Sequence, residues 1–230
     1  IHFDFSTLSG DHGSEVTAAG NLGGAGASSN ISSNSGTPLL DRNKLGGRAS
    51  VAFDGNDDIL IIDRPFPSTA KDFTFFIVMQ RADVSNDYAI AGSSDGVTDY
   101  IRFTASGGSI QTVMNEEDAV TTTTSNTNGS TVDYTQVADV PTVLVFRRAE
   151  EGELYIYADN GLYIAAKTNE AMLAAAKFTI QAIGGTTSGS LSDFTGNIGE
   201  VGMYDADIGE ESAIILSKEL STKWGVNRTS

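Results

Sequence analysis

The stretch of sequence that decides the fold is Ala49-Ser-Val-Ala-Phe-Asp-Gly-Asn-Asp-Asp-Ile-Leu-Ile-Ile62. Its two ends are rich in Val, Ile and Phe, whose side chains favour extended backbone. Its middle, Asp54-Gly-Asn-Asp57, contains the residues that turns prefer, because they adopt turn geometry or bond their own backbone. The pattern therefore predicts two strands, Ser50–Phe53 and Asp58–Ile62, around a tight turn.

A second segment near the other end of the chain, Gly196-Asn-Ile-Gly-Glu-Val-Gly-Met-Tyr204, predicts another strand. A helix is predicted to follow it, because apolar residues recur at helical spacing. These apolar residues are Ala213, Leu216, Leu220 and Trp224. Asp207 with Glu210 predicts a capping box at the start of the helix, and Gly225 predicts its end.

Between these segments, Phe73–Met79 is apolar on both faces, which is typical of a central strand. Leu154–Tyr157 and Leu162–Ala165 flank Asp159-Asn-Gly161, and Asn-Gly is a strong hairpin signal because both residues tolerate positive φ. Residues 20–36 are polar and of low complexity, so they are expected to form a surface loop. The side chains expected in the core are Phe53, Phe75, Ile77, Phe146, Ile198 and Trp224.

These motifs, in this order, resemble the concanavalin A-like lectin/glucanase superfamily in its laminin-G-like branch. The resemblance implies one domain over residues 1–230, an all-β jelly-roll sandwich of two antiparallel sheets with a short C-terminal helix. It does not imply one function, because lectins, glycosidases, adhesins, receptor ectodomains and viral surface proteins share this architecture.

Composition excludes several kinds of partner. The net charge is −16, from 14 Lys and Arg against 30 Asp and Glu, so nucleic acid and anionic membranes are both expected to be repelled. No apolar run approaches the roughly 18 residues of a membrane span, and no signal peptide is visible. The absence of cysteine excludes disulfides and thiol chemistry. The chain begins at Ile1 rather than Met, which leaves open whether upstream residues were removed.

The catalytic residues of hydrolases are scarce. The histidines are His2 and His12, and no Gly-x-Ser-x-Gly motif accompanies them. The glycosidases of the resembled superfamily carry Glu-x-Asp-x-x-Glu on one strand, and this string does not occur. Glu150-Glu-Gly-Glu153 reads as a solvated turn, and Glu200 is expected to have a structural role. The chain is therefore predicted not to be an enzyme, and a lyase that uses Tyr and Arg is the catalytic alternative left open.

One cluster has the chemistry of a metal site. Asp54, Asp57 and Asp58 place three carboxylates close together, and calcium prefers oxygen ligands of this kind. The resemblance adds that laminin-G-like modules often bind calcium at loop ends. The alternative is a turn in which these side chains bond their own backbone, and the sequence favours it over calcium.

Sugar binding needs exposed aromatic rings. Tyr155 and Tyr157 share one face of their predicted strand, with Tyr163 on the hairpin partner. These three residues are the candidate ligand contacts, although cross-strand packing in the protein is the alternative and the preferred interpretation.

Two functions remain open. The first and preferred one is a structural protein of an exposed assembly, such as a bacteriophage decoration, tail or fibre protein. It is favoured by Ser/Thr/Asn/Gly-rich loops, by the absence of cysteine and by a fold that fills the chain. The alternative is an extracellular, adhesin-like carbohydrate-binding module, for which a dependence on calcium is left open. The expected partners are proteins of the assembly or a surface glycan, at an extracellular or virion surface, and a homo-oligomer is left open.

Overall fold

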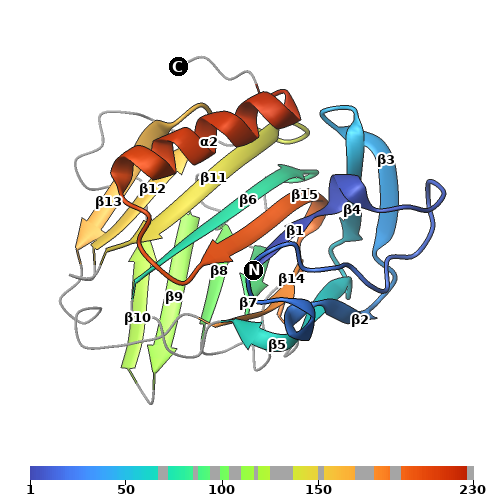
Figure 1. The fold of residues 1–230 in the computed structure, drawn as a ribbon, viewed down its shortest axis with the longest axis horizontal. Helices are drawn as coiled ribbons and strands as arrows, with labels where there is room; N and C mark the ends of the chain where they lie inside the picture. Colours follow the sequence, from blue (N-terminus) through green and yellow to red (C-terminus); the bar gives the residue numbers. More distant parts are fainter. Residues whose placement is uncertain are drawn as a thin grey trace.

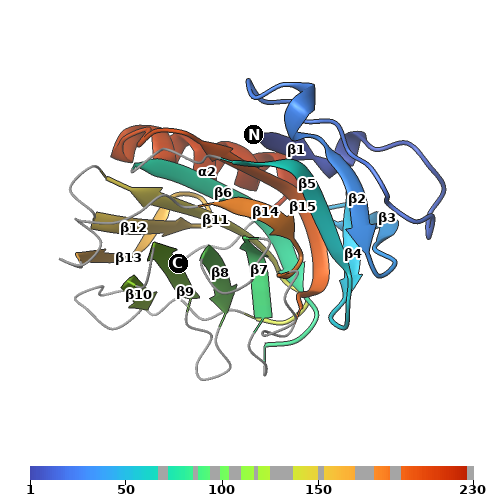
Figure 2. The same cartoon turned by 90° about the horizontal axis from the view of Figure 1, so that it is seen from below.

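A computed structural model shows two antiparallel sheets stacked as a β-sandwich (Figures 1 and 2). It describes residues 1–66, 72–84, 88–93, 99–103, 110–116, 119–124, 137–149, 153–168, 179–186 and 193–226. No helix within these ranges is long and apolar enough to cross a membrane.

The first sheet runs in the order β13 (Leu162–Thr168), β12 (Glu153–Ala158), β11 (Pro141–Arg148), β6 (Phe73–Arg81), β15 (Thr195–Tyr204), β4 (Arg48–Asp54) and β3 (Leu39–Leu45), with β1 (His2–Asp4) beside β15. The second runs in the order β10 (Ala119–Thr124), β9 (Ile110–Glu116), β8 (Asp99–Phe103), β7 (Tyr88–Gly92), β14 (Ile180–Ile183), β5 (Ile59–Phe66) and β2 (Ile31–Ser35). Short 3₁₀ turns, η1 (Phe5–Thr7) and η2 (Ala27–Ser29), and the helix α2 (Glu210–Trp224) complete the described elements.

Strand β6 is the centre of the first sheet, as its apolar sequence predicts. It lies between β11 and β15, and all of its residues are buried. Phe75 and Ile77 face the second sheet, whereas Phe76 and Val78 face α2, because successive side chains of a strand point to opposite faces. One strand therefore supplies two apolar layers.

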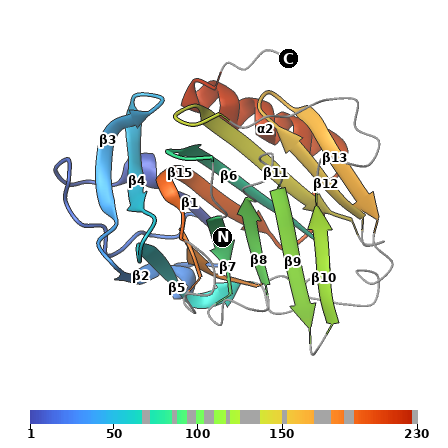
Figure 3. The same cartoon turned by 180° about the vertical axis from the view of Figure 1, so that it is seen from behind.

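The six predicted core residues are all buried. Phe53, Phe75, Ile77, Phe146 and Ile198 lie in the cluster between the sheets. Trp224 belongs to a second cluster, formed where α2 packs on the outer face of the first sheet across β11 (Figure 2). The two apolar layers place α2 on one outer face of the sandwich, while the second sheet covers the other side, as seen from behind in Figure 3.

The helix ends as predicted but begins differently. Gly225 closes it in the left-handed conformation, with φ 67°. The predicted capping box at Asp207 and Glu210 is wrong, because the residue that precedes the helix is Gly209. Asp207 instead accepts a hydrogen bond from Gly209 N at 2.9 Å and pairs with Arg147. The Asp207 carboxylate, which the local sequence pattern predicts to cap the helix, forms an ion pair with Arg147 instead.

The chain around the Asp54–Asp57 turn forms the two predicted strands, but they do not pair with each other. β4 lies in the first sheet and β5 in the second. The turn therefore carries the chain across the edge of the sandwich. The Asn160-Gly161 turn does close a hairpin, with φ 55° and 79° as predicted.

Residues 20–36 are not entirely loop. Ile31–Ser35 forms the edge strand β2, which pairs with β5. Ile31 is the one apolar side chain of this strand, and it is 1% exposed. The strand is polar elsewhere because it lies at the edge of its sheet, which is why its composition resembles that of a loop.

Candidate functional site

Asp54, Asp57 and Asp58 form an acidic corner at the edge of the sandwich where β4 ends. Their carboxylate oxygens lie within 4.8 Å of one another, so the structure brings together the three predicted metal ligands. Gly55 permits this approach. Its φ is 84°, and a Cβ at this position would lie 1.9 Å from the Thr195 hydroxyl. The corner is thus formed by β4 and by its neighbour in the sheet, β15.

Two of the three carboxylates also bond nearby backbone. Asp58 is 4% exposed and accepts hydrogen bonds from Thr37 N at 2.6 Å and Asp54 N at 2.8 Å. Asp54 accepts from the backbone N and the side-chain amide of Asn56 at 2.8 and 3.0 Å. The Asx-bonded turn foreseen as the alternative to calcium is therefore present. Because a carboxylate oxygen has more than one lone pair, these bonds leave acceptor capacity for a cation.

The electrostatics of the corner are those of crowded anions. Burial raises the pKa of Asp58, the Asp54 and Thr37 N–H groups oppose this, and the charges of Asp54 and Asp57 add to it. The pKa of Asp54 is lowered, chiefly by the hydrogen bond from Asn56 N. An opposite charge placed among these groups would relieve their repulsion.

A pocket opens beside the corner, with a volume of about 330 Å³. Its lining combines the three carboxylates with Thr37, Leu39, Ala52 and Phe53. Leu39 is 38% exposed, so its side chain is accessible to a molecule in the pocket. The arrangement offers an apolar wall and several hydrogen-bond acceptors to one small molecule, which is the composition of ligand sites in general.

Asp193 is a further acidic residue near the corner, and the sequence patterns did not point to it. It is 6% exposed, and among the described residues neither its Oδ1 nor the buried Oγ1 of Thr186 has a hydrogen-bond partner. Burial raises the pKa of Asp193 to about 6; a hydrogen bond from Thr186 N opposes this, and the charges of Asp57, Asp54 and Asp58 add to it. Its only sequence signal is a lone charge between a Ser/Gly-rich run and Phe194.

We expect Asp193→Asn to raise the free energy of unfolding at pH 8 by about 1–3 kcal/mol. The native pKa lies above the ordinary value of 3.8, so the native state binds the proton more tightly than the unfolded chain. The stabilisation from protonation is complete below about pH 4 and is lost as the pH rises through 6. Urea unfolding at pH 5 and 8 tests this, and a variant less stable than wild type at pH 8 would contradict it.

Of the three predicted tyrosines, the structure describes the side chains of Tyr155 and Tyr157. Tyr157 is 1% exposed and packs beneath α2, so a ligand has no access to its ring. Tyr155 is partly buried, with the Arg147 guanidinium 4.7 Å from its ring centre. The side chain of Tyr163 lies outside the described residues, although its backbone pairs with Tyr157. Ligand contact at Tyr155 and Tyr163 stays a prediction.

Glu200 has the structural role that the sequence predicted. Its oxygens are bonded by His2 Nε2 at 2.7 Å, Lys223 Nζ at 2.6 Å and Trp224 Nε1 at 2.7 Å. Burial would raise the pKa of Glu200, but these three partners lower it overall. A buried, ionised and fully bonded carboxylate has no proton to give to a substrate. The side chains of Glu150-Glu-Gly-Glu153 lie outside the described residues.

No protein-family model matches the chain, and no curated protein matches it by sequence. Solved structures do match its fold. Domain 4 of AbnA, a GH43 extracellular arabinanase from Geobacillus stearothermophilus, in complex with arabinotriose, is 16% identical, with a TM-score of 0.62 over 94% of this chain and 96% of that one. The CBM40 of a Ruminococcus gnavus IT-sialidase, bound to α2,3-sialyllactose, is 13% identical, with a TM-score of 0.56 over 73% of this chain and 96% of that one.

The botulinum neurotoxin serotype D binding domain is 9% identical, with a TM-score of 0.64 over 95% of this chain. The chain spans about half of that domain, 51% of its length. At these identities the likeness establishes the fold alone. The protein has the concanavalin A-like jelly-roll fold, which confirms the architecture that the sequence resemblance implied.

Proposed function

We propose that residues 1–230 act as a single extracellular, non-catalytic module that binds carbohydrate in the pocket beside the acidic corner. The observation that carries the proposal is the lining of this pocket, where the exposed Leu39 and its cross-strand neighbour Ala52 lie beside the exposed acidic residues Asp54 and Asp57. A sugar ring has an apolar C–H face and a rim of hydroxyl groups. The apolar wall suits the first, and the carboxylates accept hydrogen bonds from the second.

The comparisons support a binding role. Two of the similar structures were solved with a bound sugar, sialyllactose or arabinotriose, and the third is described as a binding domain. The virion role that the sequence favoured has no counterpart among these three structures. We therefore advance the glycan as the partner and do not develop the structural role further.

The acidic corner also determines which sugars would be accepted. Asp57 is exposed at the pocket, and the whole chain carries a net charge of −16. A sugar with its own carboxylate would meet like charges there, whereas a neutral sugar would not. The proposed ligand is thus a neutral glycan, unless a bound cation compensates the charge.

Calcium is the cation that the corner would suit, with Asp54, Asp57 and Asp58 as ligands. An ion that binds only the folded state raises stability as its concentration increases. We expect saturating calcium to raise the melting temperature by several degrees, about 2–4 °C for each kcal/mol of binding in a chain of this size. The double variant Asp54→Asn/Asp57→Asn should lose this rise. Identical melting curves in calcium and in chelator would leave the corner as an Asx-bonded turn only.

The pocket itself is tested by two substitutions. Leu39→Ala removes the exposed apolar wall, and Asp57→Asn removes one charged acceptor from the rim. Each is expected to weaken glycan binding about tenfold, because each deletes a contact of roughly 1–2 kcal/mol. Leu22→Ala is the matched control, since Leu22 is 58% exposed and does not line the pocket.

Titration calorimetry with a glycan that binds the wild-type chain measures all three variants. Leu22→Ala should bind as the wild type does. If both pocket variants bind with wild-type affinity, the glycan does not bind at the acidic corner, and the proposed site is refuted.

A further inference from the structure

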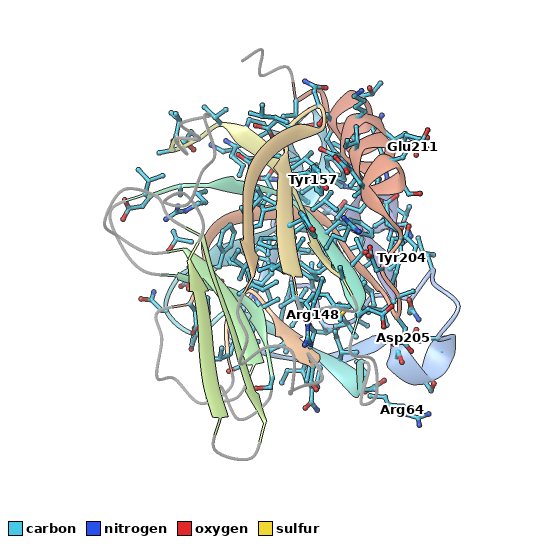
Figure 4. The ribbon with its side chains drawn as sticks, turned by 90° about the vertical axis from the view of Figure 1, so that its left-hand side faces the viewer. Arg64, Arg148, Tyr157, Tyr204, Asp205 and Glu211 are labelled. Atoms are coloured by element: carbon cyan, nitrogen blue, oxygen red, sulfur yellow. The ribbon has the colours of Figure 1, made fainter. Side chains whose placement is uncertain are left out.

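Tyr204 is exceptional among the aromatic residues. Within the described part of the chain it is the one Phe, Tyr or Trp side chain that is exposed, at 44%. It ends β15 and lies on the surface close to Asp205, away from the region of Tyr157 (Figure 4). The sequence patterns did not single it out, because it falls in a strand motif whose other residues are buried.

Neighbouring rings hold Tyr204 in place. Its ring lies 6.1 Å from that of Phe76 and is tilted by 39°, and the His2 ring meets Phe76 edge-on at 5.6 Å. Phe76 is 3% exposed and belongs to the cluster beneath α2. A Tyr supported in this way loses little further freedom when a ligand covers it, which makes it an efficient contact surface.

Polar groups surround the ring. Burial raises the pKa of Tyr204, and the charges of Glu200 and Glu219 add to this. The hydroxyl is therefore protonated at neutral pH and can donate a hydrogen bond. Glu219 is exposed on α2, and the side chain of His2 is 35% exposed. An apolar ring face thus carries its own hydroxyl donor, while the Glu219 carboxylate on α2 and the His2 imidazole on the neighbouring strand β1 are the polar groups of the adjoining elements.

This arrangement matches one sugar unit. The C–H face of a pyranose or furanose ring can cover the Tyr204 ring, while its hydroxyls reach the polar groups at the edge. Glu200 and Glu219 are the charges that act on the Tyr204 hydroxyl, and Lys223 is paired with Glu200. Because Glu219 and the net charge of −16 remain negative, an acidic sugar such as sialic acid is expected to bind less well than a neutral one.

We propose that Tyr204 is a stacking platform for a neutral sugar unit, with Glu219 and His2 contacting its hydroxyls, and that it forms a second glycan-binding surface. This proposal rests on the carbohydrate-binding function proposed above. The two surfaces are separate. Thr195 pairs with Asp54 at the acidic corner, and Tyr204 ends the same strand nine residues later, about 30 Å away at 3.3–3.4 Å per residue. Only an extended glycan could contact both.

The test is an immobilised array of neutral oligosaccharides and their sialylated counterparts, followed by titration of the neutral glycans that bind. Tyr204→Ala is expected to lower affinity for these glycans about tenfold, as loss of one aromatic stacking contact does. Tyr204→Phe keeps the ring and should stay within about threefold of wild type. Ile215→Ala, which removes a side chain that is 48% exposed on α2, should have no effect.

The outcomes separate this inference from the proposed function. If Tyr204→Ala binds like wild type while Leu39→Ala and Asp57→Asn lose affinity, the platform is refuted and the corner pocket stands. If the wild-type chain binds no glycan, the proposed function fails and the platform fails with it. Stronger binding of the sialylated glycans than of the neutral ones would also overturn the inference. Thermal melting of each variant checks its folding, and exposed positions are expected to leave it unchanged.

Discussion

Trp224→Ala is expected to lower the free energy of unfolding by about 3–5 kcal/mol, the usual cost of truncating a large buried aromatic residue. Trp224 is fully buried, and its ring lies against the backbone of Gly199, where an added Cβ would approach it to 2.5 Å. Its Nε1 also donates to Glu200 Oε2 at 2.7 Å. The substitution therefore opens a cavity beneath α2 and removes a hydrogen bond to a buried carboxylate.

Denaturant unfolding measures this loss. Ile215→Ala is the matched control, because Ile215 lies on the same helix and is exposed; its substitution should change stability by less than about 0.5 kcal/mol. A loss below about 1 kcal/mol for Trp224→Ala would mean that α2 does not dock on the sandwich.

Glu200→Gln should cost about 3 kcal/mol at pH 7, although it changes only one atom of the side chain. The amide cannot carry the charge that pairs with Lys223, and its NH₂ group would face donors rather than acceptors. These donors come from β1, through His2, and from the end of α2, through Lys223 and Trp224. Lys223 also bonds Asp4 at 2.7 Å. The carboxylate thus links the first strand, the last strand and the helix.

The pH dependence distinguishes this charge network from simple packing. The pKa of Glu200 is lowered in the folded protein, so its contribution is present above the ordinary value of 4.5 and is lost as the pH falls through the folded pKa. The difference between wild type and Glu200→Gln should therefore shrink below about pH 4. An equal difference at pH 3 and pH 7 would contradict the charge network. Glu211→Gln, the same chemical change at an exposed position on α2, serves as the control.

The sequence predicted those parts of the fold that depend on local pattern. Strand β6 is covered on both faces, so most of its side chains are apolar. This apolar run is visible in the sequence and predicts a central strand. The Asn160-Gly161 turn requires positive φ at both residues, and few other pairs supply it. The parts that failed depend on distant partners. Asp207 has the form of a helix cap, but Arg147, sixty residues earlier, binds its carboxylate.

The candidate site shows the same difference between features set by local sequence and features set by distant residues. Asp54, Asp57 and Asp58 are neighbours in sequence, so their proximity could be predicted. Asp193 joins them only because the segment before β15 lies near the β4 turn. The tyrosine prediction identified the correct strand face for Tyr157 but could not foresee that α2 covers it. Tyr204 lies at the end of β15, and its exposure depends on where the helix leaves the sheet surface uncovered.

The most direct test of the account is whether the wild-type chain binds a neutral glycan and leaves it intact. The purified protein would be titrated against glycans selected on the array, and the recovered glycan would then be analysed for cleavage. The account predicts saturable binding at one or more sites and a glycan of unchanged mass. Absence of binding at millimolar glycan, or turnover of the glycan that disappears in Glu200→Gln, would contradict it.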